Sequence, residues 1–131
     1  MIDLAVIRQN PDALKRSQEA RGESVDLVDQ VVAADAVRRS AVGEFEAVRA
    51  EQKSLGALVA KAQGAEKQEL LAKTKVLAEQ VKSTEAALRD ADTKLEELVL
   101  ALSNIVDEAA PVGGEDDFTV LREVGVKRDF V

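Results

Sequence analysis

The fold is decided by residues 45–84, FEAVRAEQKSLGALVAKAQGAEKQELLAKTKVLAEQVKST, because two mainly apolar repeats meet in this stretch on either side of Gly64. In both repeats the positions are spaced alternately by four and three residues, which is the pattern of a coiled-coil seam. The first seam consists of Leu27, Val31, Ala34, Arg38, Ala41, Phe45, Val48, Gln52, Leu55 and Val59. The second consists of Leu70, Thr74, Leu77, Val81, Thr84, Leu88, Ala91, Leu95, Leu98 and Leu102.

The two seams are mirror images about Gly64, so a chain folded there opposes them layer by layer, with Leu27 against Leu102 at the far end. This pattern predicts an all-α fold, a long antiparallel two-helix coiled-coil hairpin with its turn near Gly64. The predicted arms are residues 24–62 and 66–102. At about 1.5 Å per residue they form a rod of roughly 50 Å. A compact helical bundle is the alternative, but it usually needs a third comparable amphipathic helix.

The first 23 residues predict two short helices packed at the base of the hairpin. Asp3 can cap the first helix, and Asn10 stands before a proline that suits the first helical turn of the second. Gly22 is expected to end that helix. Ser24 is then expected to cap the first long arm.

Residues 103–131 differ in texture from the arms. A proline, two glycines and an acidic cluster predict a loop, followed by a β-prone strand at 119–124 that Gly125 ends. Gly113-Gly114-Glu115 follows no strand and opens no helix, so we interpret it as a turn and not as a phosphate-binding loop. The acids at 115–117 lack the spacing of a cation site and are expected to be solvated.

Composition excludes several classes of function. The chain has no cysteine and no histidine, which excludes disulfides, thiol chemistry, an imidazole base and a Cys/His metal site. No nucleophile–base pair is recognisable, so we expect no catalytic residue, no metal and no cofactor in these 131 residues. The start shows neither a signal peptide nor a membrane span, and the lack of cysteine fits a cytoplasmic protein.

The net charge of −7 argues against a general nucleic-acid binder, but the charge is unevenly distributed. Residues 49–82 hold seven basic and four acidic side chains, so the tip of the predicted hairpin is basic while the remainder is acidic. Any contact with RNA is therefore expected at the distal half of the arms.

The heptad register places six basic residues on one side of the hairpin, because the b and e positions of both antiparallel helices share a flank. This basic flank consists of Arg39, Arg49, Lys53, Lys75, Lys82 and Arg89. Between Arg49 and Lys82 its b and e positions carry no acid, and Gly56 and Ala78 keep it low. Such a surface suits contact with phosphates more than base stacking.

Two other interpretations of these charges stay open. They can be the ordinary solvated charges of a coiled coil, or the chain can be a structural adaptor that binds a protein partner. An adaptor predicts an apolar stripe outside the seam. The apolar residues outside the seam are scattered over both flanks: Val37, Val42, Leu58, Leu71 and Val76. Arg38, inside the seam, is expected to set the register opposite Ala91 with its guanidinium reaching outward.

The order of the motifs resembles the amino-terminal region of bacterial seryl-tRNA synthetases. It begins with Met-Ile-Asp-Leu and Asn-Pro-Asp, continues with the hairpin, in which RAEQKSLG at 49–56 is similar to a basic stretch of that family, and ends with LSNIV, APVGGEDD and LREVGVKRDF. Ser103 and Lys127 stand where many members have proline, and the second departure makes a paralogue a further alternative.

The resemblance implies that residues 1–131 form one tRNA-binding domain, and that 103–131 lead to a catalytic domain outside this sequence. The implied parent is a class II enzyme that uses ATP and magnesium to attach serine to tRNA. It would be a homodimer whose coiled coil grips the long variable arm of tRNA-Ser bound to the other subunit. The 131 residues alone are expected to be inactive.

Overall fold

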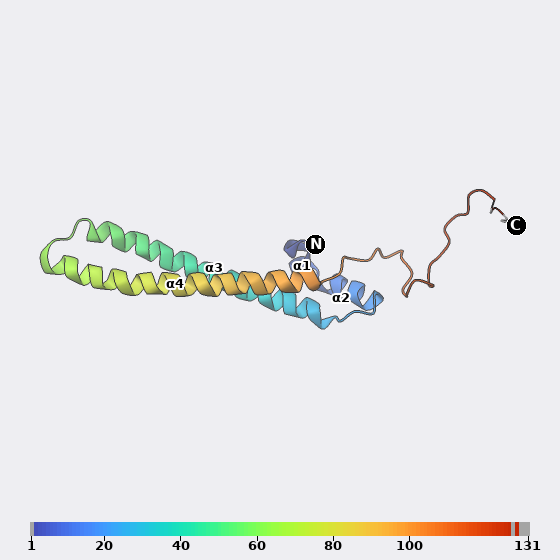
Figure 1. The fold of residues 1–131 in the computed structure, drawn as a ribbon, viewed down its shortest axis with the longest axis horizontal. Helices are drawn as coiled ribbons and strands as arrows, with labels where there is room; N and C mark the ends of the chain where they lie inside the picture. The colour runs from blue at the N-terminus through green and yellow to red at the C-terminus, as the bar shows by residue number, and fades with distance from the viewer. Residues whose placement is uncertain (1, 127, 129–131) are drawn as a thin grey trace.

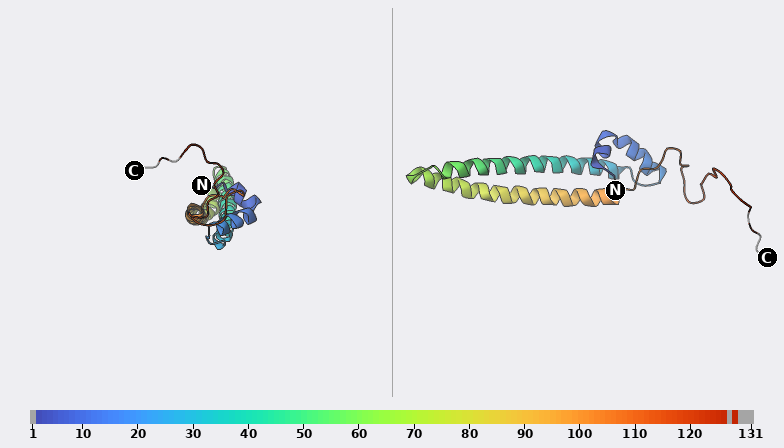
Figure 2. Two further views of the ribbon diagram at one scale, coloured as in Figure 1. Left: turned by 90° about the vertical axis from the view of Figure 1, so that its right-hand side faces the viewer. Right: turned by 90° about the horizontal axis from the view of Figure 1, so that it is seen from above.

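The computed structural model describes residues 2–126 and 128. Its helices are α1 (Leu4–Gln9), α2 (Pro11–Ala20), α3 (Asp26–Val59) and α4 (Gly64–Ala101). Figures 1 and 2 show α3 and α4 side by side as a long hairpin, with α1 and α2 packed at the end away from the turn. The C-terminal segment leads away from that end. The expected hairpin with short helices at its base is confirmed.

Burial follows the predicted seam. All of the seam positions named above are buried or partly buried, and between residues 43 and 59 no other residue of α3 is. The ion pair between Arg38 Nε and Asp92 Oδ1 joins the arms within one residue of the expected Arg38–Ala91 layer. The heptad register therefore describes how the arms meet, and Arg38 does reach outward from the seam.

The turn lies slightly earlier than the mirror point. α3 ends at Val59 and α4 begins at Gly64, so the connection is residues 60–63. The N–H groups of Lys61 and Ala62 both donate to the carbonyl oxygen of Leu58, at 3.0 Å each, which closes the end of α3. Gly64 has a φ of 61°, a left-handed conformation that glycine adopts without the strain a side chain would bring.

The caps of the short helices form as expected. The Asp3 carboxylate accepts from the Ala5 N–H at 2.7 Å, and the Asn10 side chain accepts from the Ala13 N–H at 3.1 Å. Gly22, just beyond α2, has a φ of 70°. These signals were readable because each cap depends only on its neighbours in sequence.

The prediction that Ser24 caps α3 is wrong. The N-cap residue is Val25, and no side chain caps the helix there. Val25 already has a helical backbone conformation and its carbonyl accepts from the N–H of the fully buried Val28 at 3.1 Å, so the first turn is closed without Ser24. Asp26 and Asp29 in the same turn partly compensate, since negative charge is favourable at a helix N-terminus.

The hydrophobic core sits at the base, where α1 and α2 cover the hairpin. It consists of Ile2, Ile7, Leu14, Val28, Val31, Leu95, Val99 and Leu102. The chain beyond α4 is tied to the same place, because the Gln18 side-chain amide donates to the Ser103 carbonyl at 3.1 Å and the Val106 N–H donates to the Ser17 hydroxyl at 2.8 Å. The base is thus a small domain from which the arms project.

The expected strand at 119–124 is absent from the described residues, and this prediction is wrong for the chain as it stands. A strand needs a neighbour that pairs with its backbone, and no segment lies beside this one. Leu121 is accordingly 95% exposed. Lys127, one of the two departures from the resembled pattern named above, lies outside the described residues. Gly114 does form the expected turn, closed by its N–H donating to Asp117 at 2.8 Å.

Among the described residues, no helix is both long enough and apolar enough to cross a bilayer. Within the same residues no cluster of carboxylates is placed to hold a metal ion, the acids at 115–117 included.

The base core should dominate stability. Leu14 is fully buried, whereas Leu58 on α3 is 53% exposed. Leu14→Ala should lower the free energy of unfolding by about 2–5 kcal/mol, because it leaves a cavity, while the matched control Leu58→Ala should change it by about 0.5 kcal/mol or less. Urea denaturation followed by circular dichroism measures both, and equal losses would contradict the dominant contribution of the base.

Candidate nucleic-acid interface

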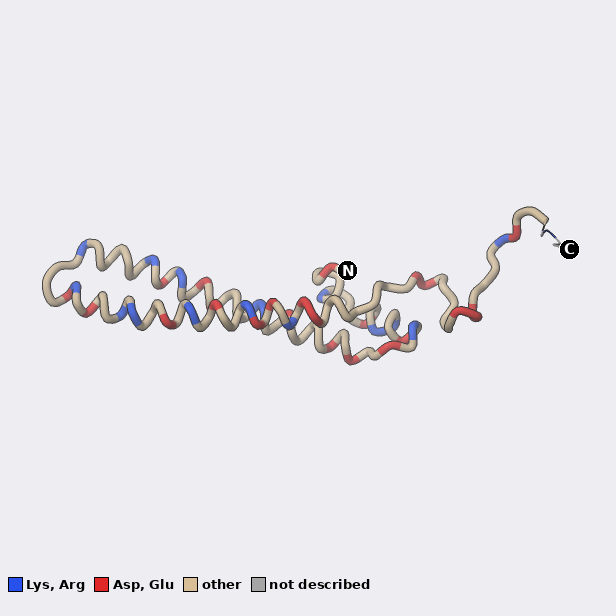
Figure 3. Tube along the Cα trace, viewed as in Figure 1, with Lys and Arg blue, Asp and Glu red and all other residues tan. Residues whose placement is uncertain are grey.

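The four distal members of the basic flank lie on the two arms away from the base. Arg49 and Lys53 stand on α3, Lys75 and Lys82 on α4, and all four are exposed. Figure 3 shows Lys and Arg on both arms of the distal hairpin. Because the burial pattern confirms the register, these residues share one flank of the rod, as the heptad positions predict.

Two members of the basic flank are accompanied by acids. Lys82 Nζ lies 3.1 Å from Glu79 Oε1, and Arg89 Nη2 lies 3.9 Å from Glu85 Oε1. All four side chains are more than half exposed, so each pair contributes little to stability. The positive potential around Lys82 is nevertheless reduced, since Glu79, although outside the b and e positions, reaches it across one helical turn.

Arg39 is the member most involved in structure. The Asp35 carboxylate is only 2% exposed, and its Oδ2 atom lies 3.0 Å from Arg8 Nε and 3.1 Å from Arg39 Nε. Arg8 comes from α1, so this cluster joins α1 to α3. Sequence reasoning missed Asp35 because its role depends on where α1 docks, although its e position on the same flank was visible from the register.

Arg49 is held differently. Its guanidinium carbon lies 5.6 Å from the centroid of the Phe45 ring, one helical turn away on α3. This distance is within the range of a cation–π interaction. Arg49, Lys53 and Lys75 form no ion pair within the part of the chain that the structure describes. These three cations therefore keep their full charge toward solvent.

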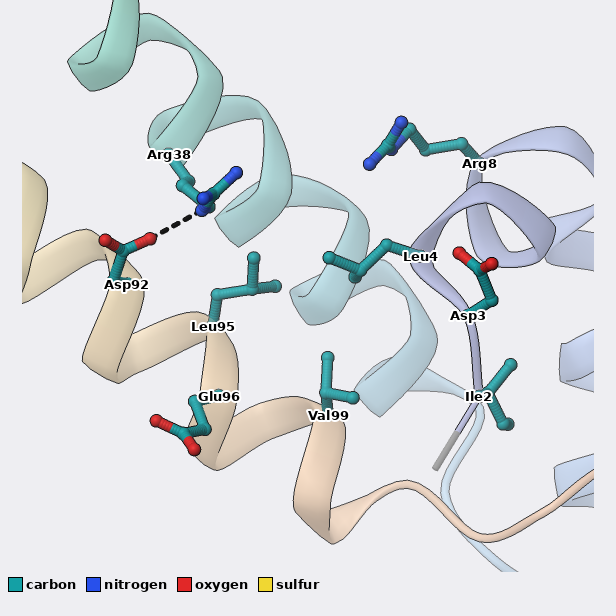
Figure 4. A pocket seen from close by; sticks show the side chains of 9 residues that line it. All are labelled: Ile2, Asp3, Leu4, Arg8, Arg38, Asp92, Leu95, Glu96 and Val99. Carbon is teal, nitrogen blue, oxygen red and sulfur yellow. Dashed lines mark hydrogen bonds and ion pairs between the residues drawn. The ribbon is translucent and has the colours of Figure 1, made fainter.

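A groove at the base lies between α1 and the hairpin. Figure 4 shows Leu4, Leu95 and Val99 on its walls, with the ion pair of Arg38 and Asp92 at one end. Its lining mixes acids, bases and apolar residues: Ile2, Asp3, Leu4, Arg8, Arg38, Asp92, Leu95, Glu96 and Val99. The groove thus has no charge of one sign to offer a phosphate, unlike the distal half of the rod.

The profile of one protein family, the seryl-tRNA synthetase N-terminal domain, matches residues 1–106. The chain belongs to this family. The resemblance seen in the sequence is therefore confirmed, and the short helices and both arms fall inside the matched range.

Curated relatives extend the similarity over nearly the whole chain. The serine–tRNA ligase of Micrococcus luteus is 52% identical over 130 residues, and that of Acidothermus cellulolyticus is 54% identical over 130 residues. Each alignment covers 99% of this chain but only 30% and 31% of the respective ligase. The chain thus spans about a third of the length of the curated relatives it matches.

Two solved structures share the fold of this seryl-tRNA synthetase N-terminal domain. Seryl-tRNA synthetase from Pyrococcus horikoshii, crystallised with ATP, aligns with a TM-score of 0.79 at 28% identity over 88% of this chain and 27% of its own. The cytoplasmic serine–tRNA ligase of Naegleria fowleri, in complex with AMP, gives 0.77 at 25% identity over 98% of this chain and 29% of its own.

The turn at Gly113-Gly114 does not have the geometry of a phosphate-binding loop. The described residues hold no metal-binding cluster, and Gly113-Gly114 closes a turn on Asp117 without opening a helix onto which a phosphate could bind. The P. horikoshii structure contains ATP, but this chain covers only 27% of that enzyme.

The Asp35 cluster should be worth more than an exposed pair of the same type. Asp35→Ala should lower the free energy of unfolding by about 1.5–3 kcal/mol, because it removes the buried acceptor of two charged donors. The control is Asp29→Ala, which removes the exposed partner 2.7 Å from Lys15, a contact whose hydrogen bond raises the pKa of Lys15. It should cost clearly less than Asp35→Ala, because an exposed pair contributes little to stability. Thermal unfolding of both variants tests this ranking.

Proposed function

We propose that this domain is the tRNA-binding arm of a serine–tRNA ligase, and that its basic flank recognises the long variable arm of tRNA-Ser mainly through the RNA backbone. The observation that carries the proposal is the combination of family membership with exposed cations on the distal arms. A rod that holds cations far from its base is suited to a ligand that extends away from the enzyme body.

The uneven charge supports this placement. The segment 49–82 has seven basic and four acidic residues, although the whole chain has a net charge of −7. An RNA approaching the molecule is repelled by the acidic base and attracted by the distal arms. The charge distribution therefore steers the RNA to one part of the rod and raises its rate of encounter there.

The chemistry of the flank favours backbone contacts over base reading. Phe45 is the only aromatic residue of the arms, and it is partly buried in the seam, so no exposed ring is offered for base stacking. Double-stranded RNA is recognised mostly through its shape, phosphates and 2′-hydroxyls. A row of Arg and Lys on a straight rod suits a helical arm of a tRNA and selects for its presence more than for its sequence.

The remaining features of the proposal concern the whole enzyme. By the family relationship, the parent would be a cytoplasmic homodimer that attaches serine to tRNA with ATP and magnesium, with these activities in the part that the present chain does not span. Residues 103–131 would connect the arm to it.

Replacing the four distal cations should remove most of the binding. In the 131-residue chain, Arg49→Ala, Lys53→Ala, Lys75→Ala and Lys82→Ala combined should weaken binding of tRNA-Ser at least tenfold at 0.1 M salt. The slope of log K against log salt should flatten by about 3 units, because fewer counterions are released. Electrophoretic mobility shift over a salt series measures both quantities.

A matched control removes four cations outside the basic flank. The combined replacement of Lys61, Lys67, Lys73 and Lys94 by alanine changes the net charge by the same amount, yet it should affect tRNA affinity much less. Equal losses in the two variants would show that only the overall charge matters and would contradict the assignment of the flank.

The variable arm itself can be tested on the RNA. The chain should bind tRNA-Ser more tightly than a tRNA with a short variable loop, and a tRNA-Ser transcript with its variable arm shortened should bind like the latter. The physical reason is that the shortened RNA lacks the phosphates that face the rod. Competition binding at one salt concentration compares the three RNAs, and equal affinities would sink the proposed target.

A further inference from the structure

Phe45 is unusual for its position in the hairpin. It is the only aromatic residue within either arm, and it fills a seam layer opposite Thr84, where an aliphatic side chain would serve the helix contact equally well. The Thr84 hydroxyl donates to its own helix, 2.9 Å from the Gln80 carbonyl and 3.1 Å from that of Val81. The ring therefore does not serve to satisfy a polar group across the seam.

The ring instead contacts a member of the basic flank. Arg49 stands one helical turn farther along α3, and its guanidinium carbon is 5.6 Å from the ring centroid. The register places the small Ala78 of α4 opposite Arg49, so little side-chain volume competes for the space beside the ring. A cation–π contact of this kind does not pair the guanidinium with an acceptor, so the N–H groups of Arg49 stay available to a ligand.

The other cations of the flank show why this matters. Lys82 and Arg89 are held by carboxylates, which orient them but offset their charge, and Arg39 is tied to buried Asp35. Lys53 and Lys75 have no ionic partner among the described residues, so they keep their charge but not a fixed direction. Of the six, Arg49 alone is oriented by a neutral group.

We propose that Phe45 is a positioning residue: its ring holds the Arg49 guanidinium against the flank, with the donors directed at an RNA phosphate. This inference rests on the proposed function. Pre-orienting a long side chain lowers the conformational entropy that is lost when it binds, without reducing its charge. The ring thus contributes to affinity without touching the RNA.

A double-mutant cycle in the 131-residue chain tests the coupling. Phe45→Leu keeps an apolar side chain in the seam but removes the ring, and should weaken tRNA-Ser binding about 2- to 5-fold, the range of an exposed cation–π contact. Arg49→Ala should weaken it at least as much. Adding Phe45→Leu to Arg49→Ala should cause no further loss. Phe45→Tyr, which keeps the ring, should bind within a factor of about 1.5 of the original chain.

The outcomes separate the positioning role from a structural one. If Phe45→Leu weakens binding by the same factor with and without Arg49, the ring acts through the coiled coil and the proposal is overturned. It is also overturned if Phe45→Leu has no effect while Arg49→Ala does, a result that leaves the tRNA-binding function standing. Thermal unfolding of each variant shows whether the arms still fold.

A measurement on the unmutated chain requires neither a variant nor RNA. Nuclear Overhauser contacts between the Phe45 ring protons and the Arg49 δ-methylene, with those δ protons shifted upfield by the ring current, are expected. Their absence overturns the proposal whatever the binding data show. The nuclear Overhauser contacts can be present while neither the unmutated chain nor the variant with all four distal cations replaced distinguishes tRNA-Ser from other RNA. In that case the proposed function fails, and the positioning role fails with it.

Discussion

Burial of one narrow seam between two antiparallel helices is the interaction on which the whole molecule depends. Beyond the base the arms meet mainly along this seam, where Leu77, Val81 and Ala91 are buried, and the cluster at the base contains no buried residue between Val31 and Leu95. The same seam fixes the direction of every other side chain, because a heptad position inside the seam determines which residues face outward on each flank. The same seam therefore determines both the stability of the rod and the positions of its charged side chains.

Along one flank, the same type of side chain has different roles because its surroundings change. Near the base, α1 covers the hairpin, so Asp35 is buried and Arg39 joins Arg8 in satisfying it. Farther out nothing covers the helices, and Arg49 is exposed. At the base, basic side chains are therefore paired with a buried carboxylate, whereas on the uncovered two-helix rod they stay available to a ligand. The different roles of the basic residues thus follow from whether other helices cover the hairpin at their positions.

The sequence predicted those features that depend on local pattern or on the repeated seam: the hairpin, its register, and the caps at Asp3 and Asn10. Prediction from the sequence failed for features that depend on how segments distant in the sequence pack together. Ser24 has the chemistry of an N-cap, but Val25 takes that position and the fully buried Val28 lies in the first turn of α3. The burial of Asp35 and its contact with Arg8 could not be read because both depend on where α1 docks, and a β-prone stretch cannot form a strand without a neighbour. The heptad register alone placed the six residues of the basic flank. The ionic partners of Arg39, Lys82 and Arg89 could be identified only from the side-chain positions in the structure.

The net charge of the chain is a poor guide to its ligand, since recognition depends on where charge can be approached. A globular RNA-binding surface of this size would need excess positive charge, because its acids and bases lie within a few screening lengths of each other. On a rod of about 50 Å the acidic base is several such lengths from the tip and is screened from it. The extended shape thus lets an acidic chain present a basic surface. In return, only a ligand that extends as far as the distal arms can contact that surface. A tRNA with a long additional arm has that property, which is why the shape of the domain and the proposed choice of RNA are consistent with each other.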